Sequence, residues 1–186
     1  MGKKRLDCIL VVDLEATCWA GKPPAGQESE IIEIGLCVLE VASGRRLENP
    51  SLLVRPERST VSDYCTQLTT LTQEELEGGM SLAETCRLLQ EKYRSGERTW
   101  ASFGDYDRRQ MQKECQARGI PYPFGRTHIN VKNLFALVHN LPKEMPLDKA
   151  MAHMGFPLEG THHRGGDDAW NIARLLGHLL LMARGE

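Results

Sequence analysis

Two acidic side chains stand one residue apart at the end of an apolar run. The run reads ILVVDLEATCW over residues 9–19, and its acids are Asp13 and Glu15. On a strand, side chains two positions apart share a face, with their Cα atoms about 7 Å apart. Two carboxylates held this close repel each other unless cations neutralise them, and oxygen ligands suit Mg²⁺ or Mn²⁺. The pair therefore predicts metal ligands, and the alternative is a strand end in solvent.

A second group of candidate residues lies near the C-terminus, in THHRGGDDAWNIA (161–173). His162 and His163 stand in a glycine-bearing loop, and Asp167 and Asp168 begin a helix. Acids in a first turn complement the helix dipole, which explains one of them. An imidazole beside a carboxylate is the usual group to take a proton from an attacking water. The pattern leaves open which histidine and which acid are used, and a solvated loop histidine is the alternative.

A third group lies in SFGDYDRRQM, where Asp105 and Asp107 flank Tyr106 between a strand and a helix. Either acid could be the N-cap of the helix. Capping then leaves the other acid without a structural explanation. In a protein built around a sheet, the ends of strands and the starts of helices can lie together at one edge of the sheet, which would bring the three groups close to one another. Four carboxylates and one histidine there would hold two metal ions about 3.5–4 Å apart, which stabilise the attacking and leaving oxygens of phosphoryl transfer.

Strands come first along the chain, and strands then alternate with helices. Residues 32–38 alternate apolar and other side chains, and a third strand is expected over 52–54 before Pro56. Two capping boxes, TQEE at 72–75 and SLAE at 81–84, each start a helix. The remaining expected elements are a strand at 99–103, a helix at 105–119, a strand and helix within 128–140, and helices at 145–155 and 167–185. This order predicts an α/β fold with a mixed sheet, antiparallel in its first three strands and then parallel, flanked by helices.

Length and composition describe one soluble globular domain. We expect 186 residues to form a single domain, 1–186, with a core at about 7–181. The N-terminal apolar stretch is too short to span a membrane and lacks a cleavage site, so it is interpreted as a first strand. Six cysteines without C-x-x-C spacing fit reduced thiols in a cytoplasmic protein. The net charge of −2 gives no sign of the basic surface common in nucleic-acid binders.

Taken in order, the three groups resemble the motifs of the DEDDh family of 3′-to-5′ exonucleases, which is named for four acids and a histidine. The segments DLEATCW, EIIEIG, QLTTLTQEEL, GDYDRRQ and HHRGGDDAWNIA are similar to the branch that trims histone mRNA ends and small interfering RNA overhangs, and to its bacterial relatives. The resemblance implies a ribonuclease H-like sheet with helices. The matching residues are Asp13 and Glu15 for D-x-E, Tyr106 and Asp107 for an aromatic followed by Asp, and His163 and Asp168 for a histidine with an acid five residues later.

The resemblance also implies a role for each matched residue. Asp13 would bridge two Mg²⁺ or Mn²⁺ ions, and Glu15 and Asp168 would hold the first. Asp107 would ligate near the second, directly or through water, and His163 would activate the attacking water. The expected reaction removes nucleoside 5′-monophosphates from the 3′ ends of RNA or single-stranded DNA. With four acids neutralised by two metal ions, the remaining charge is slightly basic and need not repel nucleic acid.

Four residues near the first motif are candidate substrate contacts. The family places the 3′-terminal nucleotide against the residues after D-x-E, which implies contacts from Leu14, Ala16 and Thr17. Trp19 could stack on a base, and a core or loop role is the alternative. Two other functions remain open, a nuclease-fold nucleic-acid-binding module with little activity and a phosphatase that uses the same metal site. The residues do not choose between RNA and DNA, since none identifies a contact to a 2′ hydroxyl.

Overall fold

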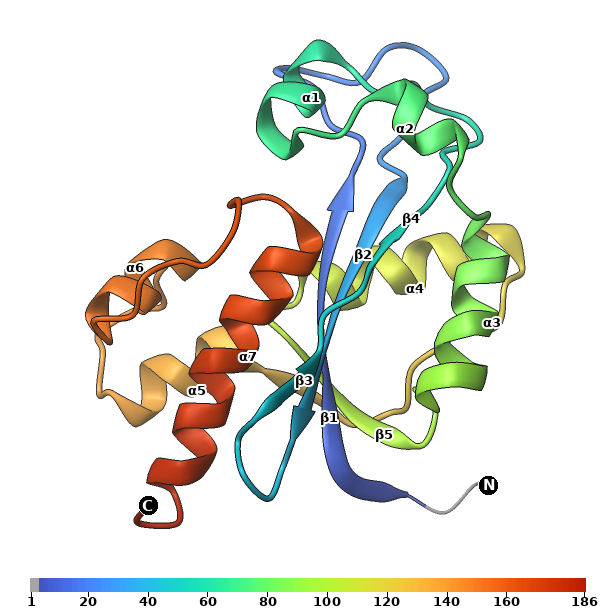
Figure 1. Ribbon diagram of the computed structural model, residues 1–186. Helices are drawn as coiled ribbons and strands as arrows, with labels where there is room; N and C mark the ends of the chain where they lie inside the picture. The colour runs from blue at the N-terminus through green and yellow to red at the C-terminus, as the bar shows by residue number, and fades with distance from the viewer. Residues whose placement is uncertain (1–3) are drawn as a thin grey trace.

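A computed structural model describes residues 4–186 and has a six-stranded mixed sheet at its centre (Figure 1). The strands are β1 (Arg5–Ala16), β2 (Ile31–Glu40), β3 (Arg46–Glu48), β4 (Ser51–Leu53), β5 (Arg98–Ser102) and β6 (His128–Asn130). Their order is β3-β2-β1-β5-β6, and β4 also pairs with β2. The first four strands pair antiparallel, and β5 and β6 continue the sheet in parallel. The predicted mixed sheet is confirmed; residues 1–3, which the sequence placed in the same domain, lie outside the described residues.

The third predicted strand is two short strands in the structure. The sequence pattern predicted one strand over 52–54, whereas β3 and β4 each have three residues and are separated by Asn49 and Pro50. Proline has no backbone N–H to donate to a neighbouring strand, so a continuous ladder cannot pass through it. Val54 lies outside β4 and forms a single bridge to Met80.

Seven helices complete the described part of the chain, and six of them were predicted. The additional one is α1, whose N-cap Ser62 accepts a hydrogen bond from the amide of Cys65. Cys65 stands where a capping box has Glu, so the usual sequence signal is missing. Both predicted capping boxes are present, at the starts of α2 and α3. The helices are α1 (Asp63–Thr69), α2 (Gln73–Glu77), α3 (Leu82–Tyr93), α4 (Tyr106–Arg118), α5 (Val131–Val138), α6 (Leu147–His153) and α7 (Gly165–Met182).

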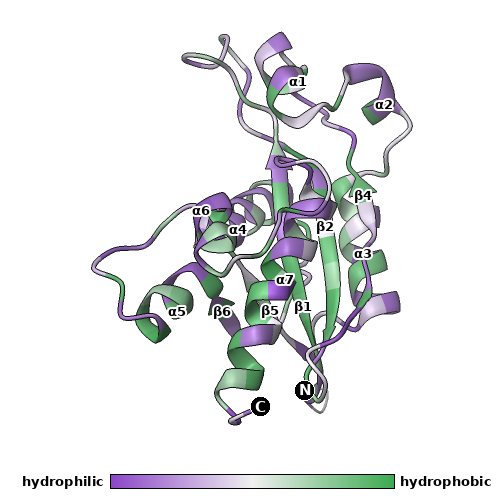
Figure 2. Ribbon diagram, turned by 60° about the vertical axis from the view of Figure 1, so that its left-hand side comes forward, coloured by the Kyte–Doolittle hydropathy of each residue, from purple (hydrophilic) through white to green (hydrophobic). Residues whose placement is uncertain are grey.

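Helices cover both faces of the sheet (Figure 1). α3 and α4 lie on one face, and α5, α6 and α7 lie on the other. Figure 2 shows hydrophobic residues concentrated along β1 and β2, between these layers. Leu10 and Val12 belong to the core on the α3 and α4 side, whereas Val11 belongs to the core under α7. Because side chains alternate along a strand, Asp13 and Glu15 continue the row of Val11 and point toward the α7 side.

Two sequence-based expectations concern the environment of the protein. No helix between residues 4 and 186 combines the length and the hydrophobicity needed to cross a membrane. All six cysteines are free thiols, and five of them are buried.

Candidate active site

The first turn of α7 packs directly against the central strands. Gly35 of β2 lies opposite Asp13 of β1, and both contact Gly165. A Cβ atom added to Gly165 would lie 3.0 Å from the nitrogen of Gly35 and 3.1 Å from the carbonyl oxygen of Asp13. The amide of Gly165 also donates to Oε2 of Glu33, at 2.9 Å. Glycine allows two backbones to approach this closely because it has no side chain. The contact between Gly35 and Gly165 places Asp168 beside the end of β1.

Three predicted acids meet at this point. Carboxylate oxygens of Asp13, Glu15 and Asp168 lie within 4.8 Å of one another. Glu15 is 9% exposed and Asp168 is 3% exposed, so these two charges are largely removed from solvent. The solvated strand end considered for Asp13 and Glu15 does not describe this arrangement. Three oxygen donors at this spacing can hold a hard divalent cation.

Asp107 reaches the same strand from the first turn of α4. Its Oδ1 accepts a hydrogen bond from the amide of Leu14 at 3.0 Å, and its side chain is buried. The parallel pairing of β5 with β1 ends at Val11 and Ala101, so the amide of Leu14 lies beyond that ladder. The carboxylate thus takes the place of a strand partner. It is held to the residue between the two acids of β1.

The sequence left open whether Asp105 or Asp107 is the acid of the second motif. The two side chains have different surroundings in the structure. Asp105 occupies the N-cap position of α4, but its side chain makes no capping hydrogen bond. It pairs instead with Arg108 at 3.3 Å and is half-buried. Asp107 is among the acids whose charge acts on Asp13. The placement therefore agrees with the resemblance, in which Asp107 is the second-motif acid.

The acids disfavour one another's ionised forms. Burial, together with the charges of Asp107 and Asp168, raises the pKa of Asp13 well above its usual range. Burial and the neighbouring Asp168 raise the pKa of Glu15 to about 8, and burial raises that of Asp107 to about 6. A divalent cation would remove this penalty by pairing with the ionised forms. The donor set and its unbalanced charge therefore fit Mg²⁺ or Mn²⁺.

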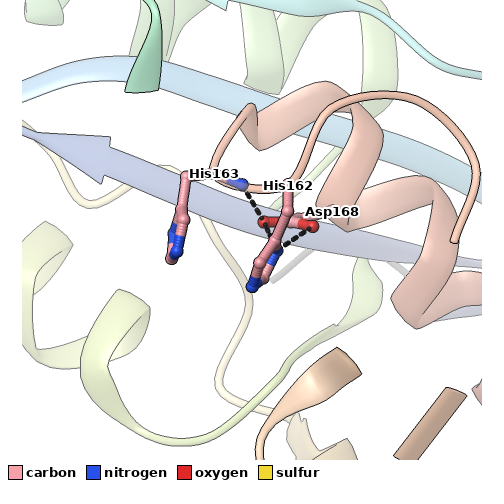
Figure 3. A group of neighbouring side chains, drawn as sticks. All are labelled: His162, His163 and Asp168. Atoms are coloured by element: carbon pink, nitrogen blue, oxygen red, sulfur yellow. Dashed lines mark hydrogen bonds and ion pairs between the residues drawn. The ribbon is translucent and has the colours of Figure 1, made fainter. Parts of the chain in front are cut away.

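The two histidines lie beside Asp168, as Figure 3 shows. The amide of His163 donates to Oδ2 of Asp168 at 2.9 Å, and Nδ1 of His162 lies 3.0 Å from its Oδ1. The two imidazoles stack with their centroids 4.0 Å apart. The ring of His163 has no hydrogen-bond partner among residues 4–186, whereas the ring of His162 is engaged by the carboxylate. His163 is thus the imidazole that is free to meet a substrate or water.

Backbone and electrostatics both distinguish His163. Its φ of 64° lies in the left-handed region, which costs an L residue on the order of 1 kcal/mol. This conformation accompanies the hydrogen bond from its amide to Asp168. Burial, followed by the neighbouring His162, lowers the pKa of His163. A neutral imidazole near pH 7 can accept a proton.

Glu159, which was not predicted from the sequence, joins the histidine loop to α7 and β3. Its carboxylate accepts hydrogen bonds from Arg46 at 3.0 Å, Trp170 Nε1 at 2.8 Å and Arg174 at 3.0 Å. The side chain of Asn171 also bonds to the amide and the carbonyl of Glu159. These contacts hold the segment that leads into the histidines. No local pattern marks Glu159, since its partners come from distant parts of the chain.

Glu33 is a second residue that the motifs did not single out. It lies opposite Glu15 in the antiparallel ladder and is fully buried. Its carboxylate accepts from the amide of Gly165 and pairs with Arg164 at 3.4 Å. It also bonds to Ser51. The signal was a charged residue inside the apolar run EIIEIG, and the structure explains it as the anchor of the α7 start.

The predicted substrate contacts differ in how accessible they are. Thr17 is fully buried, and its hydroxyl bonds to backbone groups at both ends of the segment 28–30. Its polar group is therefore occupied by the protein. Leu14 and Ala16 are buried at the site, and Trp19 is half-buried. Contacts to a nucleotide stay predictions for all four residues, Leu14, Ala16, Thr17 and Trp19.

Comparison with known proteins finds a matching family model and several relatives. A family model described as "Exonuclease" matches residues 10–176. The "3'-5' exonuclease Snipper" of Drosophila melanogaster is 29% identical over 192 residues, covering 90% of this chain and 67% of that protein. The "3'-5' exoribonuclease 1" of Homo sapiens is 28% identical over 184 residues, covering 94% of this chain and 52% of that protein. The chain thus spans about half the length of the human relative.

A solved structure shows the same fold. It is the nuclease domain of 3'hExo, described as a DEDDh family member bound to rAMP. It is 25% identical, and the match covers 99% of this chain and 96% of that chain with a TM-score of 0.86. The predicted ribonuclease H-like mixed sheet with flanking helices is therefore confirmed.

Proposed function

Because this chain belongs to the exonuclease family, we propose that it is a 3′-to-5′ exonuclease. It would hydrolyse the last phosphodiester bond of a strand and release nucleoside 5′-monophosphates. The observation that carries the proposal is the convergence of Asp13, Glu15 and Asp168 within 4.8 Å, beside a free imidazole from His163. Carboxylates with a neighbouring base match the needs of metal-assisted phosphoryl transfer.

Each of the four acids would help to hold one or both of two divalent ions. The charges of Asp107, Asp168 and Glu15 all act on Asp13, which would help to hold both ions, while Glu15 and Asp168 would complete the first position. Asp107, whose Oδ1 is occupied by the amide of Leu14, would face the second position with its other oxygen. The chemistry that such ions supply when bound is stabilisation of negative charge on the attacking and leaving oxygens.

His163 would act as the general base. Its lowered pKa keeps the imidazole neutral near pH 7, so it can take a proton from the attacking water. Asp168 holds its backbone amide, which fixes where the ring projects. His162 bonds to the same carboxylate through its ring and would act as a positioning residue. This division selects His163 over His162.

RNA is the substrate class that the comparisons favour. The human relative is named an exoribonuclease, and the similar structure is of a domain bound to rAMP. The terminal nucleotide would lie against Leu14 and Ala16 at the end of β1, with Trp19 nearby. Single-stranded DNA remains a second substrate to test.

A time course on 5′-labelled oligonucleotides tests the proposal. Matched RNA and DNA are compared as single strands, as duplexes and as duplexes with a 3′ overhang, each with Mg²⁺ or Mn²⁺. We expect a ladder that shortens from the 3′ end and disappears with EDTA or with Asp13→Asn. No shortening with either ion would refute the enzyme proposal and leave a binding module. Hydrolysis of a chromogenic phosphomonoester without action on strands would favour a phosphatase.

A further inference from the structure

A small pocket opens beside the start of α4, between this helix, the loop that follows it and β6. Its volume is about 240 Å³. The polar residues that line it are Arg108 and Gln112 of α4, Tyr122 and Arg126 of the loop, and His128 of β6. Among the described residues that line the pocket, none is an Asp or a Glu. The lining therefore presents hydrogen-bond donors and positive charge, which Asp105 partly offsets because its carboxylate lies 3.3 Å from Arg108 and 4.0 Å from Nδ1 of His128.

Two donors in this pocket are buried without partners. Within residues 4–186, neither Nε of Arg108 nor the hydroxyl of Tyr122 has a hydrogen-bond partner. Arg126 is exposed and forms no ion pair with any residue in the same range. Asp105 pairs with Arg108 at 3.3 Å, through a different nitrogen from the unpartnered one. The unpartnered Nε and hydroxyl are both closed to solvent, so a ligand can meet only the exposed side chain of Arg126 and the outer nitrogens of Arg108, whose side chain is 41% exposed.

The size and walls of the pocket identify a phosphate group. At about 240 Å³ it is smaller than the roughly 300–1,000 Å³ usual for a drug-sized ligand. Of its aromatic residues, Trp100 and Phe124 stack on each other at 4.5 Å and are both buried, His128 lies 4.2 Å from the ring of Trp100, and Tyr122 meets Phe124 edge-on at 5.9 Å. No open ring face is therefore left for a base. Guanidinium groups pair well with phosphate oxygens, often with two parallel hydrogen bonds.

The pocket also lies next to the proposed catalytic site. Arg108 directly follows Asp107 in the first turn of α4. On the other side, Nε2 of His128 lies 2.9 Å from the hydroxyl of Ser102. Ser102 in turn forms a hydrogen bond with the side chain of Asp107. The pocket is thus linked to Asp107 through α4 and through Ser102.

We propose that this pocket binds a backbone phosphate of the substrate strand upstream of the bond that is cleaved. Arg126 and Arg108 pair with the phosphate oxygens. The inference rests on the proposed exonuclease function for the direction of the strand. It adds a subsite that recognises the sugar-phosphate backbone and is indifferent to the base.

Binding of labelled RNA separates this subsite from catalysis. Fluorescence anisotropy is measured with a decamer and a dinucleotide in an Asp13→Asn background with Mg²⁺, which prevents cleavage. Arg126→Gln and Arg108→Gln are compared with Arg109→Gln, an exposed neighbour outside the pocket. For the decamer we expect Kd to rise about 3- to 10-fold in the two pocket variants, with a salt slope smaller by about 1. The dinucleotide has no upstream phosphate, so its Kd should stay the same.

The control and a second ligand make the outcome decisive. If Arg109→Gln weakens the decamer as much as Arg126→Gln does, the effect is general electrostatics and the subsite is refuted. Inorganic phosphate alone is then tested by its effect on the Tm. Arg126→Gln that binds the decamer normally but loses a phosphate-dependent rise in Tm would assign the pocket to free phosphate, against the proposal. Failure of the protein with intact acids to cleave RNA would instead refute the proposed function, while the binding comparison still tests the subsite.

Discussion

The amide of Leu14 donates a hydrogen bond of 3.0 Å to Oδ1 of Asp107, joining residues 93 positions apart in the sequence. The bond fixes the first turn of α4 to the strand that carries Asp13 and Glu15. It satisfies a buried backbone donor beyond the end of the β5 ladder. Because Oδ1 already accepts this bond, Oδ2 is the freer of the two oxygens for a cation. The same contact thus stabilises the fold and orients the fourth acid.

Asp107→Asn should separate these two roles. The amide oxygen of Asn can still accept from Leu14, so we expect the Tm to change little. The loss of negative charge should lower kcat at least 100-fold, or about 2.7 kcal/mol in activation free energy. Asp105→Asn is the matched control, because Asp105 pairs with Arg108 at the surface, and its kcat should stay within about threefold. A larger loss in the Asp105 variant would reverse the assignment of the second-motif acid.

The two histidines should differ sharply in their effect on turnover. His163→Ala removes the free imidazole, and we expect kcat to fall about 10²- to 10⁴-fold with the fold intact. His162→Ala removes a ring held by Asp168, and we expect a loss of about tenfold or less. A pH–rate profile adds a second measure, since the acidic limb due to the base should disappear only in the His163 variant. Equal losses in both variants would contradict the assignment of His163 as the base.

Binding of Mg²⁺ should strengthen as the pH rises. The metal requires ionised carboxylates, whereas the pKa of Glu15 is raised to about 8 and that of Asp107 to about 6. We therefore expect the apparent affinity to increase between pH 6 and pH 8, with release of protons. Calorimetry in two buffers that differ in ionisation enthalpy measures this release. Glu15→Gln should release fewer protons, and an affinity that does not depend on pH would contradict the raised pKa values.

The same shifts predict how the stability of the metal-free protein depends on pH. A carboxyl whose pKa is raised by folding favours the folded state while it is protonated, so its stabilising effect is complete below the unfolded pKa near 4.5. The effect is lost as the pH rises through about 8. We expect the Tm to fall over this window without metal and to recover with Mg²⁺. In Glu15→Gln the fall should be shallower.

The sequence predicted the parts of the site that follow from local pattern. Alternation along β1 placed Asp13 and Glu15 on one face, and that face is the one under α7. A helix was expected to begin at 167, after a glycine-bearing loop, and α7 begins slightly earlier, at Gly165, with Asp168 in its first turn. Such features depend on neighbours within one element, which is why a single sequence contains them.

The parts that were missed depend on contacts between distant segments. The burial of Glu33 is explained by its contact with the start of α7. Its carboxylate accepts a hydrogen bond from the amide of Gly165, which is 132 positions away in the sequence. The position of Glu159 is explained in part by Arg46, which is 113 positions away in the sequence. The hydroxyl of Thr17 bonds to the segment 28–30, a contact that the sequence did not indicate, and the predicted contact of Thr17 with substrate stays a prediction. Residue type and spacing carry no information about such partners.

Glu159→Gln should affect turnover through the position of the histidine loop. The neutral amide weakens the ion pairs with Arg46 and Arg174 and leaves fewer acceptors for their donors. We expect kcat to fall about 3- to 30-fold while the apparent affinity for Mg²⁺ stays the same, because Glu159 contacts none of the acids. Glu144→Gln, on an exposed side chain bonded to Asn133, serves as the control. A change in metal affinity without a change in kcat would contradict a role in positioning the loop.

Gly35→Ala tests the close approach on which the site depends. An added Cβ would overlap the backbone of Gly165 and Gly166, where neither backbone can move without displacing the start of α7. Since that turn carries Asp168, we expect a loss of several kcal/mol in the free energy of unfolding, together with weaker Mg²⁺ binding. Gly21→Ala is the control, because nothing lies within 4 Å of its added Cβ. If Gly35→Ala retained both stability and metal affinity, the position of Asp168 would not depend on this packing.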